Sequence, residues 1–159
     1  MNRYLPDPAA TDEFAAQLSA VLPADVAGWI MLLEGELGAG KSTFARALIH
    51  AMGHEGAVPS PTYTLVEPYQ LPAATIYHID LYRISDEEEL QFLGWTELED
   101  GFRLVEWPQR VPGLRQSADL LLHLDYVDHG RHAELLSLSE RAEKVISRLD
   151  EDSDTQLQD

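Results

Sequence analysis

The chain has 159 residues, no cysteine and a formal net charge of −17, from 28 acidic and 11 basic side chains. This length suits one domain with a core of its own, and the absence of cysteine excludes disulfides and thiolate metal sites. The few lysines and arginines do not cluster, which argues against direct binding to a nucleic-acid backbone, and no apolar run approaches the roughly 20 residues that span a bilayer, so we expect a soluble protein.

The first third of the chain predicts a helix, a buried strand and a second helix. Thr11 can cap a helix that runs to about Leu22. The continuous apolar run 28–34 (GWIMLLE) is typical of a strand that is buried on both faces. Apolar residues then recur at helical spacing over 44–51, and Gly53 ends this second helix.

Strands alternate with helices in the remainder of the chain, and a hairpin follows. This order indicates an α/β fold, a P-loop NTPase-like three-layer sandwich whose sheet is mainly parallel with antiparallel additions. One domain would cover residues 1–149, and the acidic residues 150–159 would form a disordered tail. The expected elements are strands at 64–69 and 75–81, an acidic helix at 86–93, a strand at 102–107, a hairpin of strands 118–127 and 131–138, and a helix at 139–149.

The segment 35–42 (GELGAGKS) matches the phosphate-binding pattern G-x-x-x-x-G-K-[ST]. Its glycines allow backbone conformations in which successive N–H groups converge on one anion, and the following helix adds a partial positive charge. Lys41 would contact the β- and γ-phosphates of ATP, and the Ser42 hydroxyl would bind Mg²⁺. The alternative, a glycine-rich turn that only caps a helix, fits poorly between a buried strand and an amphipathic helix. The nucleotide-binding residues expected here are Gly35, Gly38, Ala39, Gly40, Lys41, Ser42 and Thr43.

Two acidic residues end predicted strands and could act with this loop. A nucleoside triphosphatase needs a carboxylate to hold Mg²⁺ or its waters and to orient the attacking water. Asp80 and Glu106 would meet at the carboxyl edge of the sheet, where ligands bind in α/β folds. The alternative is that each is an ordinary strand-end carboxylate that faces solvent. Thr62, in the loop 60–64, could meet the γ-phosphate or Mg²⁺, although Ser-Pro-Thr is also a common turn.

Four segments together, 35–43 (GELGAGKST), 60–66 (SPTYTLV), 78–83 (HIDLYR) and 105–108 (VEWP), closely resemble the bacterial TsaE family. The resemblance covers nearly the whole chain. It implies a small cytoplasmic ATPase that is slow alone and is stimulated by the partner proteins TsaB and TsaD. ATP hydrolysis would reset that complex between rounds of forming N6-threonylcarbamoyladenosine at position 37 of tRNAs that read codons starting with A. The chain would reach tRNA only through the complex.

The resemblance also implies roles for single residues. Lys41 and Ser42 match the phosphate-binding lysine and the Mg²⁺-binding hydroxyl, and serine replaces the threonine that is commoner in the family. Glu106 matches a Mg²⁺-linked glutamate. Asp80 matches a carboxylate that is important for hydrolysis, and Thr62 matches a loop residue near the γ-phosphate.

Two further matches lie outside these segments. Thr11 and Arg131 correspond to positions near the outer side of the nucleotide. A small-molecule kinase would use the same glycine-rich loop, but it needs arginines over the transferred phosphoryl group and a lid, and the arginines of this chain are scattered. A nucleotide-binding scaffold that does not hydrolyse ATP is a third possibility, against which the two strand-end acids argue.

Overall fold

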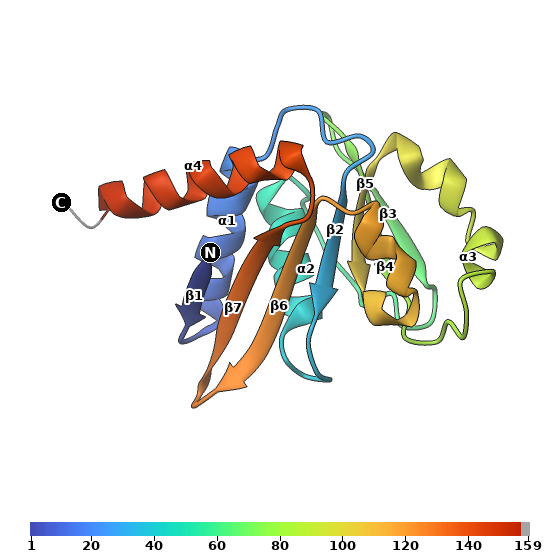
Figure 1. Cartoon of the computed structure of the whole chain (residues 1–159), viewed down its shortest axis with the longest axis horizontal. Helices are drawn as coiled ribbons and strands as arrows, with labels where there is room; N and C mark the ends of the chain where they lie inside the picture. Colours follow the sequence, from blue (N-terminus) through green and yellow to red (C-terminus); the bar gives the residue numbers. More distant parts are fainter. Residues whose placement is uncertain (157–159) are drawn as a thin grey trace.

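A single seven-stranded sheet organises the chain, and its strand order is β1-β7-β6-β2-β5-β4-β3 (Figure 1). The computed structural model describes residues 1–156, with the backbone alone for 154–156. The strands are β1 (Asn2–Leu5), β2 (Ile30–Glu34), β3 (Val66–Gln70), β4 (Thr75–Asp80), β5 (Phe102–Glu106), β6 (Leu120–Val127) and β7 (Gly130–Ser137). The α-helices are α1 (Pro8–Val21), α2 (Lys41–Ala51), α3 (Glu89–Phe92) and α4 (Glu140–Gln156), and 3₁₀ helices are η1 (Trp95–Asp100), η2 (Pro108–Arg110) and η3 (Pro112–Gln116).

The centre of the sheet is parallel. Strand β2 pairs in parallel with β5 on one side and β6 on the other, and β4 continues the parallel set beyond β5. Antiparallel strands flank this parallel set on both sides, because β3 pairs with β4, β7 with β6, and β1 with β7. The predicted α/β fold, with a parallel sheet and antiparallel additions, is confirmed.

The sheet separates two hydrophobic cores. On one face, Met31 and Leu33 of β2 pack in the core that α1, α2 and α4 cover, with Phe14 and Phe44 among its fully buried side chains. On the other face, Leu32 packs with side chains from α3 and the 3₁₀ helices. Because β2 is apolar on both faces, it occupies the middle of the sheet, as the continuous run in the sequence predicts.

The beginning of the chain differs from the prediction. The helix cap is Asp7, whose carboxylate accepts a hydrogen bond from the backbone N–H of Ala10, so Thr11 is not the cap and lies inside α1. Asp is as good a cap as Thr, and Pro8 suits the first helical position. Strand β1 was not predicted, since four residues before a proline are too few to show an alternating pattern.

Two helices also differ from their predicted ranges. The acidic helix expected at 86–93 is reduced to α3, because 86–88 form a turn in which the Asp86 carboxylate accepts from the N–H of Glu89. The last helix does not end at Leu149 but continues to Gln156, over most of the segment expected to be disordered; residues 157–159 lie outside the described residues. None of the helices within residues 1–156 has the length and apolar character of a membrane span.

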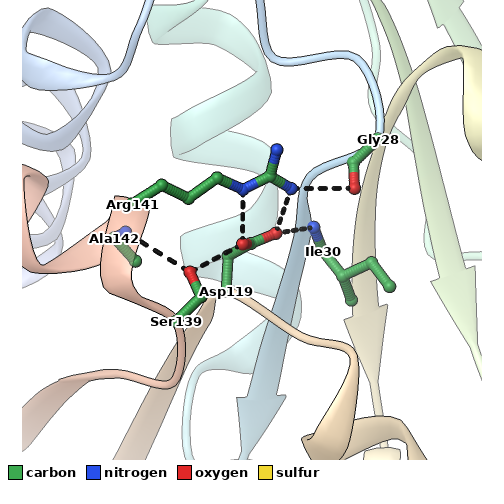
Figure 2. Close-up of polar contacts among 6 residues, drawn as sticks. All are labelled: Gly28, Ile30, Asp119, Ser139, Arg141 and Ala142. Carbon is green, nitrogen blue, oxygen red and sulfur yellow. Dashed lines mark hydrogen bonds and ion pairs between the residues drawn. The ribbon is translucent and has the colours of Figure 1, made fainter.

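A polar cluster around the buried Asp119 fixes the start of α4 against the amino-terminal ends of the parallel strands, which we call the amino edge of the sheet (Figure 2). Asp119, which precedes β6, accepts hydrogen bonds from Arg141 Nε at 2.7 Å, from the Ser139 hydroxyl at 2.8 Å and from the Ile30 N–H at 3.0 Å. Arg141 also donates to the carbonyl of Gly28. Burial raises the pKa of Asp119, but these hydrogen bonds and the charge of Arg141 outweigh it, so the pKa lies below its ordinary value.

Candidate functional site

The loop between β2 and α2 (residues 35–40) curls back at the carboxyl edge of the sheet, opposite α4 (Figure 1). Gly40 caps α2 at φ +107°, a left-handed conformation that disfavours a Cβ, and no side chain caps this helix. A Cβ at Gly35 would lie 2.5 Å from the carbonyl oxygen of Leu124 in β6, so glycine is needed there as well. The N-terminal amides of α2, which helices leave unpaired, are therefore available to an anion.

Two pockets adjoin at the N-terminus of α2. One, of about 280 Å³, lies between the start of α1, the end of the loop and the β6–β7 turn. The other, of about 310 Å³, lies between the loop, the ends of β4 and β5, and the segment that contains Thr62. Gly40, Thr43 and Arg131 line both pockets, so one elongated ligand could occupy the two. We call them the α1 pocket and the loop pocket.

The structure brings the predicted site residues together around these two pockets, with one exception. Gly35 lies beneath the loop, against β6, and lines neither pocket. Thr11, although it is not the helix cap, lines the α1 pocket from inside α1. The α1 pocket contains Thr11 and Ala39, the loop pocket contains Gly38, Lys41, Ser42, Thr62, Asp80 and Glu106, and both contain Gly40, Thr43 and Arg131.

Asp80 and Glu106 are direct neighbours, because the last residues of β4 and β5 pair in register. Both side chains are almost fully buried. Glu106 Oε1 accepts a hydrogen bond of 2.8 Å from the hydroxyl of Ser42, at the start of α2, and Glu106 Oε2 lies 2.6 Å from Nε2 of His78. The strand register therefore holds the two carboxylates side by side, and one of them contacts the start of α2.

The Asp80 carboxylate has fewer hydrogen-bond partners than that of Glu106. Its Oδ1 accepts a hydrogen bond of 2.8 Å from the N–H of Tyr82. Burial raises the pKa of Asp80, the charge of Glu106 raises it further, and the N–H of Tyr82 and the charges of His78 and Lys41 oppose this; the net direction is upward. A cation that binds beside the two carboxylates would stabilise the ionised form.

Lys41 lies with its ammonium group inside the loop. Its Nζ donates hydrogen bonds to the carbonyl oxygens of Gly35 at 2.7 Å and Glu36 at 3.0 Å, and it lies 4.2 Å from the centre of the Trp107 ring. Burial lowers the pKa of Lys41, against the opposing charges of Glu106 and other nearby acids. The side chain thus places a positive charge at the loop pocket, which it lines.

Arg131 connects the β6–β7 hairpin to the loop. Its Nε donates to the carbonyl of Ala39 at 2.8 Å, its second terminal nitrogen lies 3.3 Å from the carbonyl of Gly38, and its guanidinium stacks 3.6 Å from the centre of the Tyr126 ring. These contacts fix the conformation of the loop. They also place a guanidinium at the junction of the two pockets.

Thr62 belongs to a tight turn over 61–64. The N–H of Leu65 bonds to the carbonyl of Pro61 at 2.8 Å, and the hydroxyls of Ser60 and Thr62 lie 2.8 Å apart. Leu65 has a φ of +68°, which is unfavourable for a residue with a side chain. The side chain of the neighbouring Tyr63 is 83% exposed.

The side chains at the loop pocket fit a Mg²⁺–phosphate ligand. Mg²⁺ prefers oxygen donors and is usually held by one or two side chains together with substrate phosphates and water. The Ser42 hydroxyl and Glu106 Oε1 supply two such oxygens close together, with Asp80 beside them. Among the side chains that the structure describes, those of residues 1–153, no group of three or more acidic, histidine or cysteine residues is arranged to hold a metal.

Sequence reasoning missed some residues of the site. His78 is 1% exposed and contacts Glu106, and the available signal was its position two residues before Asp80, which puts both side chains on one face of β4. Tyr82 lines the loop pocket, and Asp7 and His129 line the α1 pocket. For Tyr82 the available signal was its place in the segment 78–83, just after β4. No local pattern marked Asp7 and His129, because their proximity depends on how α1 and the β6–β7 turn pack together.

A family model described as "Threonylcarbamoyl adenosine biosynthesis protein TsaE" matches residues 5–133. The tRNA threonylcarbamoyladenosine biosynthesis protein TsaE of Haemophilus influenzae is 38% identical over 151 residues, which cover 92% of this chain and 96% of that protein. The protein of the same name from Synechocystis sp. is 40% identical over 119 residues, or 72% and 74%. The crystal structure of YdiB from Bacillus subtilis shares the fold, with a TM-score of 0.75 and 24% identity over 96% of this chain and 95% of that one.

Proposed function

Because this chain belongs to the TsaE family, which acts in the biosynthesis of threonylcarbamoyladenosine in tRNA, we propose that it is the ATP-binding and ATP-hydrolysing subunit of that pathway. The observation that carries the proposal is the 2.8 Å contact between Ser42 and Glu106. It puts a hydroxyl and a carboxylate at the N-terminus of α2, which no side chain caps, beside a buried lysine. Such an arrangement of positive dipole, ammonium and oxygen donors suits a triphosphate with its Mg²⁺.

The nucleotide would extend through both pockets. Its phosphates would bind to the amides of the loop and α2, with Lys41 at the β- and γ-phosphates. The nucleoside would occupy the α1 pocket, where Thr11 and Thr43 offer hydroxyl groups and Leu5 and Leu124 offer apolar surface. Arg131 stands where the two parts of the ligand would join.

Hydrolysis would occur at the loop pocket. Mg²⁺, when bound, supplies positive charge to the phosphate oxygens. Ser42 and Glu106 would hold it, while Asp80 would accept a hydrogen bond from the attacking water and orient it toward the γ-phosphate. Thr62 would close this side of the pocket.

We expect the isolated chain to be slow, because Arg131 is the arginine that lines these pockets in the described chain and the loop carbonyls already engage it. An arginine supplied by a partner accelerates comparable NTPases about 10³–10⁵-fold. We propose TsaB and TsaD as the partners and tRNA as an indirect one, since a net charge of −17 opposes direct contact with RNA.

The test is ATP turnover by the purified chain, alone and with the TsaB–TsaD complex. We expect slow Mg²⁺-dependent release of phosphate that rises when the complex is added. Fast turnover without partners, or no response to them, would count against the proposal. Transfer of the γ-phosphate to a small-molecule acceptor would favour a kinase instead.

A further inference from the structure

His78 is a buried polar side chain to which nothing in the proposed function yet assigns a task. It lies in β4, its side chain is 1% exposed, and its Nε2 is 2.6 Å from Oε2 of Glu106, which is 2% exposed. Its Nδ1 has no hydrogen-bond partner among the described residues. The contact with Glu106 is therefore the polar interaction that positions the imidazole ring, with Nε2–H as donor and the carboxylate as acceptor.

The two oxygens of Glu106 have separate partners. Oε2 faces His78 on β4, and Oε1 faces the hydroxyl of Ser42 on α2. Rotation of the carboxylate would break one or both contacts. The orientation of Glu106 is thus fixed from two different elements of the fold, and Oε1 is the oxygen that contacts Ser42, which lines the loop pocket together with Glu106.

We propose that His78 is a positioning residue that orients Glu106 so that Oε1, together with Ser42, binds the metal of the nucleotide complex. The inference rests on the proposed function and assigns the residue that sets the geometry of its metal site. Groups that hydrogen-bond to metal ligands in this way typically change metal affinity or activity about 10–100-fold when they are removed.

A packing role alone accounts poorly for an imidazole at this position. An apolar side chain would fill the same space without burying a ring nitrogen that lacks a partner, which is unfavourable. The side chain of Ile76, on the same face of β4, is fully buried and apolar and shows what this face requires for packing. The polar ring at His78 is explained by the carboxylate that it contacts.

Two amide variants separate positioning from packing. In His78→Gln the side-chain amide reaches about as far as Nε2 and can still donate to Glu106, whereas in His78→Asn it reaches only to about the position of Nδ1. A matched control is Tyr77→Phe, which removes a 2.7 Å hydrogen bond to Asp100 from the other face of the same strand. Thermal unfolding of each variant establishes that it is folded.

The measurement is the affinity for Mn²⁺, followed by electron paramagnetic resonance in the presence of saturating ADP, with metal-free ADP affinity measured separately. We expect His78→Asn to weaken Mn²⁺ binding at least about tenfold, His78→Gln to retain most of it, and Tyr77→Phe to match the wild type. Metal-free ADP affinity should be unchanged in all three.

Equal Mn²⁺ affinity in the Asn and Gln variants would overturn the assignment of His78. If both variants fail to fold while Tyr77→Phe folds, His78 serves packing and the assignment is also overturned. If the wild-type chain binds neither ADP nor Mn²⁺–ADP, the proposed function fails instead, so the two failures are distinguishable.

Discussion

Two buried carboxylates at opposite edges of one sheet have opposite surroundings. Asp119, at the amino edge, accepts hydrogen bonds from a guanidinium, a hydroxyl and a backbone N–H, and its pKa lies below the ordinary value. Asp80, at the carboxyl edge, has the N–H of Tyr82 as its hydrogen-bond donor and Glu106 as a neighbour, and its pKa is raised. The two carboxylates are buried to a similar extent, so burial alone does not distinguish a structural carboxylate from one at a binding site.

The basic side chains near these two carboxylates also differ in the groups to which they donate. Arg141 donates directly to Asp119 and neutralises it. Lys41 donates to loop carbonyls, although Asp80 and Glu106 lie nearby and line the same pocket. At the amino edge the charge of Asp119 is paired within the protein, and the cluster holds α4 in place. At the carboxyl edge Lys41, Asp80 and Glu106 line one pocket, where a ligand could pair with their charges. Changes at one edge should therefore affect stability and changes at the other should affect binding.

The largest effect should come from Lys41→Ala. Loss of the ammonium group removes a charge-assisted contact with phosphate, so ATP affinity should fall more than about 100-fold. Titration calorimetry with ATP and Mg²⁺ measures this. Lys41 is buried and donates hydrogen bonds to the carbonyls of Gly35 and Glu36, so urea unfolding should first establish that the variant is folded. ATP binding equal to that of the wild type would contradict the site.

Arg141→Ala tests the other edge. It leaves the Asp119 carboxylate buried without its cation, and we expect a loss of about 2–3 kcal/mol in the free energy of unfolding, less than for a fully buried pair because Arg141 is half exposed. Urea unfolding measures the change. Arg148→Ala, an exposed arginine of α4, is the control and should stay within about 0.5 kcal/mol of the wild type. Loss of ATP affinity in a folded Arg141→Ala variant would contradict the claim that the amino edge affects stability and not binding.

Glu106→Gln should separate binding from stability at the carboxyl edge. The amide keeps the shape of the side chain but removes the charge, so the affinity for Mg²⁺ in the ADP complex should fall about tenfold or more. Unfolding should remain cooperative. Unaltered Mg²⁺-dependent binding and hydrolysis in this variant would show that Glu106 is not a metal ligand.

The smallest effect concerns pH. Because the pKa of Asp119 is lower in the folded state than its ordinary value of 3.8, the ionised carboxylate stabilises the fold above that pH. This contribution is lost as the pH falls through the folded pKa. The stability advantage of the wild type over Asp119→Asn should be constant near neutrality and shrink below about pH 4, as urea unfolding at several pH values would measure; a constant difference at all pH values would contradict it.

The residues that meet at the carboxyl edge could be predicted from the sequence better than those that meet at the amino edge. The glycine-rich pattern at 35–42 and the acids that end β4 and β5 are local signals, and parallel strands necessarily bring their ends together. Asp119 and Arg141 are 22 residues apart and meet only when α4 returns to the sheet, so neither carried a signal of its own. The predicted strand bounds fall within two residues of the observed ones, because apolar runs and turn residues set them.

Other features depend on contacts that no local pattern encodes. Strand β1 forms because β7 provides an edge for it, and its four residues show no pattern alone. The 3₁₀ helices and α3 follow from how the segments after β4 and β5 cover the second core. The role of His78 depends on a neighbour 28 residues away.

Hydrogen exchange with and without ATP and Mg²⁺ tests the central claim most directly, because it observes both edges of the sheet at once. The account predicts slower exchange for the amides of 35–43 and of the loop 60–64, and no change around Asp119 and the start of α4. Unchanged exchange over 35–43 at saturating ATP, or protection confined to the amino edge, would contradict it.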